Sequence, residues 1–286
     1  MLRVEKERRA LHAASAAASR LDLIYERIVV VSDAANTIVR FEPLPIVARV
    51  SPWPLADWVK VRLEREIAVA LHLAAKGAPA VLPSRGISPG PHYLEDIGLS
   101  LWQFVDCGPA GDRDGPAAAA ALRRLHGALA DFPGALPSFT ESIAYCAKTL
   151  RDPGALPGLP EEERAFLRRD HERTRAALEA VEFDSVPIHG DAHLGNLLVT
   201  DDGPIWGDLE AASAGPIEWD LACLPEAARS AYGARNQDLE RILRRLRSHA
   251  VVIWCSALDD PNERQREAVD YHLGAMKREA PLSAAG

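Results

Sequence analysis

Three polar residues between positions 189 and 208 have types and spacing that suit phosphoryl transfer. Asp191 is followed, after four intervening residues, by Asn196, and Asp208 lies further along the same segment. In phosphoryl-transfer sites one carboxylate handles the acceptor hydroxyl, while an amide and a second carboxylate hold magnesium on the triphosphate. The segment therefore predicts a magnesium-dependent phosphoryl-transfer site.

The stretch that joins Asn196 to Asp208 has the pattern of a β-hairpin. Residues 196–200 have the composition of a strand, residues 201–203 supply turn chemistry, and residues 204–206 form a returning strand. Because a hairpin brings its two ends together, we expect Asn196 and Asp208 to reach one Mg²⁺, which prefers oxygen ligands. Asp191 precedes the hairpin and is free to face a substrate hydroxyl.

Two other interpretations of these residues remain open at this point. Asp and Asn are common in loops and caps, so Asp191 and Asn196 can simply satisfy backbone donors. His189, Asp191 and His193 alternate along the chain and could instead form the ligand cluster of a metallohydrolase. Catalytic zinc usually takes three protein ligands, mostly histidines, and the remaining histidines lie in helix-like surroundings without a matching motif. The joint spacing therefore favours phosphoryl transfer.

The segments 189–196, 208–210 and 215–222 read HGDAHLGN, DLE and GPIEWDLA. They resemble the aminoglycoside phosphotransferase and choline kinase-like family. The resemblance covers most of the chain, and its specific motifs lie within residues 186–222. It implies an α+β, bilobal, protein kinase-like fold with a small N-terminal antiparallel-sheet lobe and a larger, mostly helical C-terminal lobe. It also implies ATP and Mg as cofactors.

The same resemblance implies a role for each motif residue. Asp191 matches the catalytic base, and Asn196 and Asp208 match the magnesium ligands. Three further residues are expected to support the catalytic loop rather than to enter the chemistry: His189, His193 and Asp220.

The N-terminal third is expected to form the nucleotide lobe. A helix is expected over residues 5–20, and strands over residues 25–31, 37–41 and 45–50. The turn at residues 32–36 stands where the family places its phosphate-covering loop. It is not rich in glycine, so an ordinary hairpin turn and a nucleotide-binding loop are equally compatible with it.

Arg49 occupies the third strand at the position where kinase-like folds usually carry a lysine. Arginine keeps its charge and contacts phosphate oxygens bidentately, so we predict that it binds the nucleotide phosphates. A helix is expected over residues 55–75, and its Glu66 is the expected partner of Arg49. The alternative for Glu66 is a solvent-exposed position on an amphipathic helix.

The hinge between the lobes is expected near residues 102–107, where backbone groups of Gln103 to Val105 are predicted to bind an adenine. The expected domains are therefore residues 1–106, the N-terminal nucleotide-binding lobe, and residues 107–286, the C-terminal lobe with the catalytic loop and acceptor site. Further helices are expected over residues 117–131, 161–181, 236–257 and 261–277.

The acceptor is expected to be a small molecule. Six residues separate Asp208 from Gly215, and a protein kinase needs a longer segment there to dock a peptide. The net charge of −8 argues against a nucleic-acid partner and suits a cationic acceptor, such as an aminoglycoside-like antibiotic or an amino alcohol. A sugar is a further candidate, and the oligomeric state stays open.

The composition fits a cytoplasmic enzyme of this kind. The chain has 286 residues, 48% of them apolar, which is enough for a large core. No apolar run has membrane-spanning length, so no membrane partner is expected. The N-terminus lacks a signal-peptide core, and the four cysteines are scattered, as is typical of reduced thiols.

The leading hypothesis is an ATP- and Mg-dependent phosphotransferase that acts on a hydroxyl of a small molecule. The alternative is a pseudokinase-like protein that binds nucleotide without transferring phosphate. Arg49 and the glycine-poor loop motivate this alternative. Asp191, Asn196 and Asp208 argue against it, because a pure binder has no need of all three.

Overall fold

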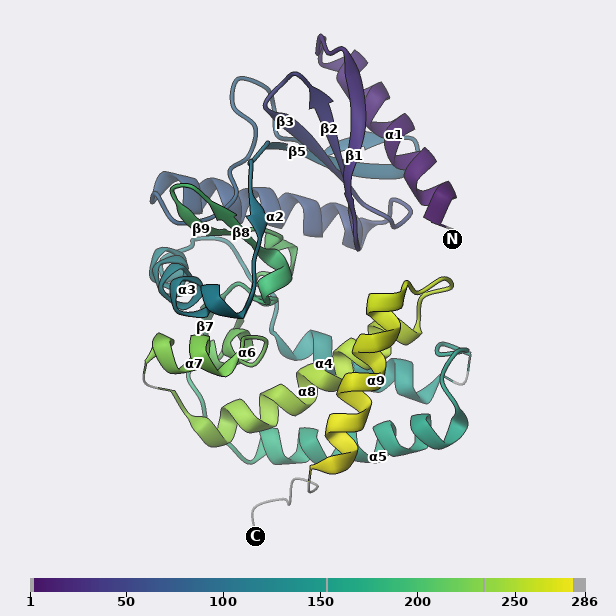
Figure 1. Ribbon diagram of the computed structural model, residues 1–286, viewed down its shortest axis with the longest axis vertical. Helices are drawn as coiled ribbons and strands as arrows, with labels where there is room; N and C mark the ends of the chain where they lie inside the picture. Colours follow the sequence, from purple (N-terminus) through teal and green to yellow (C-terminus); the bar gives the residue numbers. More distant parts are fainter. Residues whose placement is uncertain (1–2, 153, 234, 280–286) are drawn as a thin grey trace.

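The computed structural model describes residues 3–152, 154–233 and 235–279, and it separates into a sheet-containing N-terminal part and a mostly helical C-terminal part (Figure 1). The N-terminal sheet has five antiparallel strands in the order β1-β2-β3-β5-β4. Their bounds are Arg27–Asp33 for β1, Thr37–Glu42 for β2, Ile46–Val50 for β3, His92–Leu94 for β4 and Ile97–Gln103 for β5.

Helices α1 (Arg3–Arg20) and α2 (Asp57–Ala75) pack against opposite faces of this sheet. Side chains alternate between the two faces along a strand. On β3, Ala48 and Val50 join the core beneath α1, whereas Val47 joins the core beneath α2. Arg49 shares the face of Val47, so the strand directs its side chain toward α2.

Alanines explain how closely α1 approaches the sheet. Its buried positions are all alanine and recur every three or four residues, which places them on one helix face. Such small side chains bring the helix backbone near the strands, and the larger side chains of the sheet fill the space between. The buried alanines are Ala10, Ala13, Ala14, Ala17 and Ala18.

The C-terminal part contains a central helix α3 (Gly115–Leu129), which packs into the same core as α2. The outer helices are α4 (Thr140–Arg151), α5 (Glu161–Glu179), α6 (Ile217–Leu221), α7 (Glu226–Tyr232), α8 (Gln237–Ser256) and α9 (Glu263–Arg278). In Figure 1, α8 and α9 cross in the lower part of the molecule, in front of α4 and α5. Within the described residues, no helix combines the length and apolar character needed to cross a membrane.

Two small sheets fix the catalytic segment. Strands β8 (Leu197–Thr200) and β9 (Gly203–Trp206) form the expected hairpin, and β6 (Gly108–Pro109) extends it by one strand. The strand before the catalytic loop, β7 (Val186–Ile188), pairs with β10 (Ser213–Gly215). The hairpin is also tied to the N-terminal part, because Trp206 N–H donates to the Pro79 carbonyl at 2.8 Å.

The expected fold class is confirmed, with shifts of a few residues at most element ends. The main difference is α4, for which no helix was expected, and its apolar stripe of Ile143, Cys146 and Leu150 is short. The short strand β6 was not expected either, and it forms only by pairing with β8. Asn196 lies in a 3₁₀ turn just before β8 rather than in the strand.

Candidate active site

Asp191 lies in the loop between β7 and the hairpin, and Gly190 makes the path of that loop possible. Gly190 has a φ of +85°, and a Cβ built there would lie 1.9 Å from the Ala211 carbonyl oxygen. Side chains of L-residues are disfavoured at this φ, and the backbone approach leaves no room for one. Glycine thus allows the loop to pack directly against the segment that follows Asp208.

Asp220, on α6, fixes the start of the loop that contains Asp191. Its carboxylate accepts hydrogen bonds from the backbone N–H groups of His189 and Gly190, each at 2.8 Å, and from His126 Nε2 at 2.8 Å. Burial alone would raise the pKa of Asp220, but its hydrogen bonds to His126 and the loop hold that pKa below its usual value. Asp220 therefore remains charged and fixes the loop, as the sequence suggested.

His189 and the hairpin ends bring the next two site residues together. His189 Nε2 contacts the Gly207 carbonyl at 2.9 Å, and Gly207 N–H donates to the Asn196 carbonyl at 2.9 Å. The residue before Asp208 is thus hydrogen-bonded to Asn196, as the hairpin pattern predicted. Asn196 Nδ2 donates to the Asp191 carbonyl at 2.9 Å, which leaves its Oδ1 as the atom suited to a metal ion.

Asp208 has an unusual backbone and an unusual charge environment. Its φ is +56°, a conformation that non-glycine residues adopt rarely and mainly at functional positions. Burial raises the pKa of Asp208, and Glu210 and Asp191 add to the rise, although Arg49 acts in the opposite direction. The carboxylates around Asp208 therefore create excess negative potential at this point.

Arg49 connects β3, α2 and the segment after the hairpin. Its guanidinium contacts Glu66 at 2.8 Å, Asp208 at 2.5 Å and Glu210 at 2.9 Å. Both members of the Arg49–Glu66 pair are buried, so Glu66 is not the solvent-exposed residue of the alternative interpretation. The guanidinium neutralises part of this carboxylate cluster.

Besides Arg49, Glu210 collects contacts from two segments of the N-terminal part, α2 and the turn between β1 and β2. Arg62 contacts its carboxylate at 2.8 Å, Arg65 donates to its carbonyl at 2.9 Å, and Asn36 donates to the carboxylate at 3.3 Å. Asn36 belongs to the turn between β1 and β2. The turn between β1 and β2 therefore lies next to the carboxylate cluster of Glu66, Asp208 and Glu210.

The predicted hinge residues follow β5 directly. Gln103 donates its N–H to the Leu82 carbonyl at 3.0 Å and its side-chain amide to the Pro83 carbonyl at 3.0 Å. The next N–H, of Phe104, donates to the Pro45 carbonyl at 2.9 Å. These donors are used within the protein, so the geometry favours Val105 over Gln103 as the donor to an adenine.

Arg247 on α8 was not identified from the sequence, although it contacts Asp191 directly. Its guanidinium pairs with Asp191 Oδ1, while His193 Nε2 lies 3.6 Å from Oδ2. Burial would raise the pKa of Asp191, but Arg247, with His193, lowers it below its usual value. The available signal was a run of arginines at 244, 245 and 247 within an apolar helix pattern, which did not indicate the contact partner.

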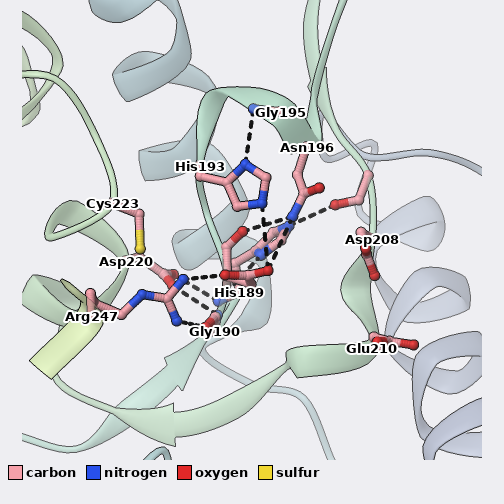
Figure 2. A network of polar contacts seen from close by, with 12 residues as sticks. His189, Gly190, His193, Gly195, Asn196, Asp208, Glu210, Asp220, Cys223 and Arg247 are labelled. Carbon is pink, nitrogen blue, oxygen red and sulfur yellow. Dashed lines mark hydrogen bonds and ion pairs between the residues drawn. The ribbon is translucent and has the colours of Figure 1, made fainter. Parts of the chain in front are cut away.

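Figure 2 shows Arg247 on one side of the catalytic loop and Asp208 with Glu210 on the other. Asp191 lies between these groups through its contacts with Arg247 and Asn196. An acceptor hydroxyl at Asp191 would thus face a carboxylate, with the amide and carboxylate of Asn196 and Asp208 on one side. This arrangement is able to place a hydroxyl in line with a phosphate held beside Asp208.

The oxygen donors fit magnesium better than zinc. Magnesium usually takes one or two carboxylates, with phosphates and waters completing its octahedron, and Asn196 and Asp208 offer such a set. In the part of the chain that the structure describes, no three His, Cys, Asp or Glu side chains are placed to share a metal ion. His189 is engaged by Gly207, so it is not placed to serve a metallohydrolase.

Comparison with known proteins identifies the relatives of this architecture. The model of a phosphotransferase enzyme family matches residues 26–270. That interval includes every site residue described above. No curated protein matches the chain in sequence at a significant level.

Solved structures share the fold across nearly the whole chain. A choline/ethanolamine kinase family protein from Mesorhizobium loti is 21% identical with a TM-score of 0.66, over 93% of this chain and 95% of that one. An aminoglycoside 2'-phosphotransferase-IIIa in complex with GDP is 13% identical with a TM-score of 0.68, over 93% and 99%. An amicoumacin kinase with AMP-PNP and Ca²⁺ is 12% identical with a TM-score of 0.70, over 98% of each chain. These likenesses establish the bilobal, protein kinase-like fold.

Proposed function

Because the chain belongs to the phosphotransferase enzyme family, we propose that it transfers the γ-phosphate of ATP to a hydroxyl of a small molecule. The observation that carries this proposal is the convergence of Asp191, Asn196 and Asp208 between the two lobes. Gly207 hydrogen-bonds Asn196, and Asn196 hydrogen-bonds Asp191, so the three residues are held by one chain of contacts. Their functional roles are part of the proposal.

In this proposal Asp191 binds and orients the acceptor hydroxyl and takes its proton. Oδ1 is paired with Arg247, so Oδ2 is the oxygen available to the hydroxyl. The lowered pKa of Asp191 keeps it ionised at neutral pH. Positioning contributes more to such a reaction than proton affinity, because the transferred phosphoryl group has a loose transition state.

Asn196 and Asp208 would hold Mg²⁺ through the Asn196 Oδ1 and the Asp208 carboxylate. Bound magnesium would neutralise charge on the triphosphate. Arg49 would bind nucleotide phosphates from the opposite lobe and would be oriented by Glu66, with which it already pairs. Backbone groups near Val105 would bind the adenine. GDP in one structural neighbour makes GTP a donor to be tested beside ATP.

The acceptor proposed here is a small molecule rather than a protein. After Asp208 the chain forms one short turn, pairs β10 with β7 and enters α6. No room remains in this segment for the platform on which protein kinases bind an extended peptide. The named activities of the structural neighbours, on choline or ethanolamine and on aminoglycosides, also concern small molecules. A kinase that uses ATP and has free cysteines is suited to the cytoplasm.

The second candidate is a pseudokinase-like protein that binds nucleotide without transfer. One observation favours it, because Arg49 contacts Asp208, the proposed magnesium ligand, at 2.5 Å. A cation already at this carboxylate competes with a metal ion. The enzyme remains the better proposal because Asp191 serves no purpose in nucleotide binding, yet its loop is fixed by a dedicated set of contacts.

The test compares the native chain with Asp191→Ala. ADP formation is measured with ATP, Mg²⁺ and a panel of hydroxyl acceptors, and nucleotide binding is measured by calorimetry. We expect Asp191→Ala to lower turnover by about 10²- to 10⁴-fold, as for loss of a general base, with nucleotide affinity nearly unchanged. Asp202→Ala, on the exposed hairpin turn, is the control and should be fully active. Undiminished turnover of Asp191→Ala would refute the assignment.

A further inference from the structure

The side-chain group paired with Asp191 is a cation. Arg247 pairs with Asp191 Oδ1, and its Nη1 donates to the Gly190 carbonyl at 3.4 Å. Its guanidinium lies over two indole rings, 4.8 Å from the centre of Trp219 and 5.9 Å from that of Trp254. These contacts hold the charge in one place against the catalytic loop.

Arg247 lies on the acceptor side of Asp191 rather than on the metal side. Asp208 and Glu210, which mark the proposed magnesium and triphosphate side, lie across the loop from Arg247 (Figure 2). In an in-line transfer the acceptor approaches from the side opposite the leaving nucleotide. Arg247 therefore borders the space from which the acceptor reaches Asp191.

The guanidinium retains donors for a ligand. It carries five N–H groups, and it contacts Asp191, the Gly190 carbonyl and the Cys223 thiol. The hydrogen bonds described for it, from Nη2 to Asp191 and from Nη1 to the Gly190 carbonyl, use two of these donors. Trp254 at its edge is 38% exposed, whereas Arg247 itself is 6% exposed.

Two acidic residues of the C-terminal part, Glu218 and Glu226, are engaged within the protein. The Glu218 carboxylate accepts from the Asn236 N–H at the start of α8, at 2.8 Å. Glu226 pairs with Arg229 and with Arg235. The net charge of −8 is compatible with a cationic acceptor, but an acceptor responds mainly to the charges nearest its own groups.

We propose that Arg247 is a specificity-determining residue that binds an anionic group, such as a carboxylate, on the hydroxyl-bearing acceptor. This inference rests on the proposed function. Arg247 already compensates the charge of Asp191, so an ammonium group gains little attraction there and meets the guanidinium at close range. A carboxylate gains a charge-assisted hydrogen bond from the guanidinium, which is the cation nearest to Asp191 among the contacts described.

The test uses three small probes of equal carbon number that differ in charge: glycerate, glycerol and serinol. An equimolar mixture is added to the protein loaded with ADP and Mg²⁺, and bound probes are detected by saturation-transfer NMR. We expect glycerate to give the strongest signal and serinol the weakest. In Arg247→Met, glycerate affinity should fall by about tenfold, the usual effect of losing a hydrogen bond to a charged group.

Arg241→Met is the matched control, because Arg241 is an exposed arginine on the same helix that pairs with Asp238 alone among the contacts described. It should bind glycerate as the native chain does. Arg247→Lys serves if Arg247→Met fails to fold. Lysine keeps the positive charge but lacks the planar guanidinium, which can contact Asp191 and a carboxylate at the same time. In this variant glycerate should bind more weakly than to the native chain, but still more tightly than serinol.

Three results would overturn the inference: serinol binding as well as glycerate, no binding of glycerate, or equal glycerate binding in the native chain and the Arg247 variants. Binding of ADP with Mg²⁺ is measured in the same samples. If the native chain fails to bind ADP with Mg²⁺, the result counts against the proposed function. If it binds ADP with Mg²⁺ but not glycerate, the result counts against the role of Arg247 alone.

Discussion

Asp208 and Asp220 flank the short segment after the hairpin, and their surroundings differ in kind. Asp220 is fully buried and accepts hydrogen bonds from two backbone N–H groups and from His126. Asp208 has a side chain that is 31% exposed and contacts Arg49, with Glu210 close by. One carboxylate is satisfied by the protein itself, and the other is left partly open beside like charges.

The pKa values of the two groups move in opposite directions for this reason. Burial opposes ionisation at both, but the donors around Asp220 outweigh it and lower the pKa, whereas the carboxylates around Asp208 raise the pKa despite Arg49. A residue that supports the fold is stabilised as an anion by fixed neighbours. A residue that binds a cation keeps an unfavourable charge until the ligand arrives.

Replacing Asp208 by asparagine tests the proposed cation-binding role of Asp208. The variant removes one proposed magnesium ligand and the excess negative charge, so we expect turnover to fall by at least about 10²-fold, as when one group that stabilises transition-state charge is lost. Steady-state assays over a Mg²⁺ titration measure this. Asp202→Asn on the exposed turn is the control and should behave as the native chain.

Replacing Asp220 by asparagine tests the structural role of Asp220. An amide presents a donor where His189, Gly190 and His126 all need an acceptor. We expect a loss of about 2 kcal/mol in the free energy of unfolding, because buried donors lose their partner. Denaturant titration measures it. A variant as stable as the native chain contradicts the supporting role of Asp220.

Arg49→Lys sharpens the comparison by changing the cation that serves Asp208. Lysine keeps a positive charge but concentrates it on one nitrogen, so it cannot hold Glu66, Asp208 and Glu210 in the manner of the guanidinium. We expect the KM for ATP to change by less than about tenfold, with kcat largely retained, because the phosphates still meet a cation. Loss of all activity would show that the planar guanidinium of Arg49 is required, and not only its positive charge.

The sequence predicted those parts of the site that depend on local spacing. Asn196 and Asp208 meet because a hairpin closes between them, and hairpin signals are local. Glu66 could be paired with Arg49 because strand alternation and helix periodicity restrict where each side chain points. The supporting role of Asp220 was also readable, since Asp220 belongs to the same motif region.

Contacts between distant segments were not predictable in the same way. Arg247 reaches Asp191 from α8, and this depends on how α8 crosses the catalytic loop, a packing result that periodicity does not encode. Backbone groups of Gln103 to Val105 are predicted to bind an adenine, and the sequence did not reveal that the segment at residues 82–83 accepts the Gln103 backbone N–H and side-chain amide. The division at residue 106 stays a prediction.

The smallest expected effects concern the pH dependence of stability, where the two aspartates should act with opposite signs. The folded-state pKa of Asp220 lies below its ordinary value of 3.8, so its contribution is present above that pH and is lost as the pH falls through the folded pKa. The folded-state pKa of Asp208 lies above 3.8, so its contribution is present below that pH and is lost as the pH rises through the folded pKa.

Asp208→Asn should therefore be more stable than the native chain at neutral pH, by about 0.5 kcal/mol, and this gain should vanish near pH 4. Asp220→Asn should be less stable at neutral pH, and its deficit should shrink below pH 4 as the native carboxylate takes up a proton. Thermal unfolding at a series of pH values measures both differences. Curves that shift in the same direction for the two variants would mean that Asp208 is held by the fold as firmly as Asp220, rather than kept open for a cation.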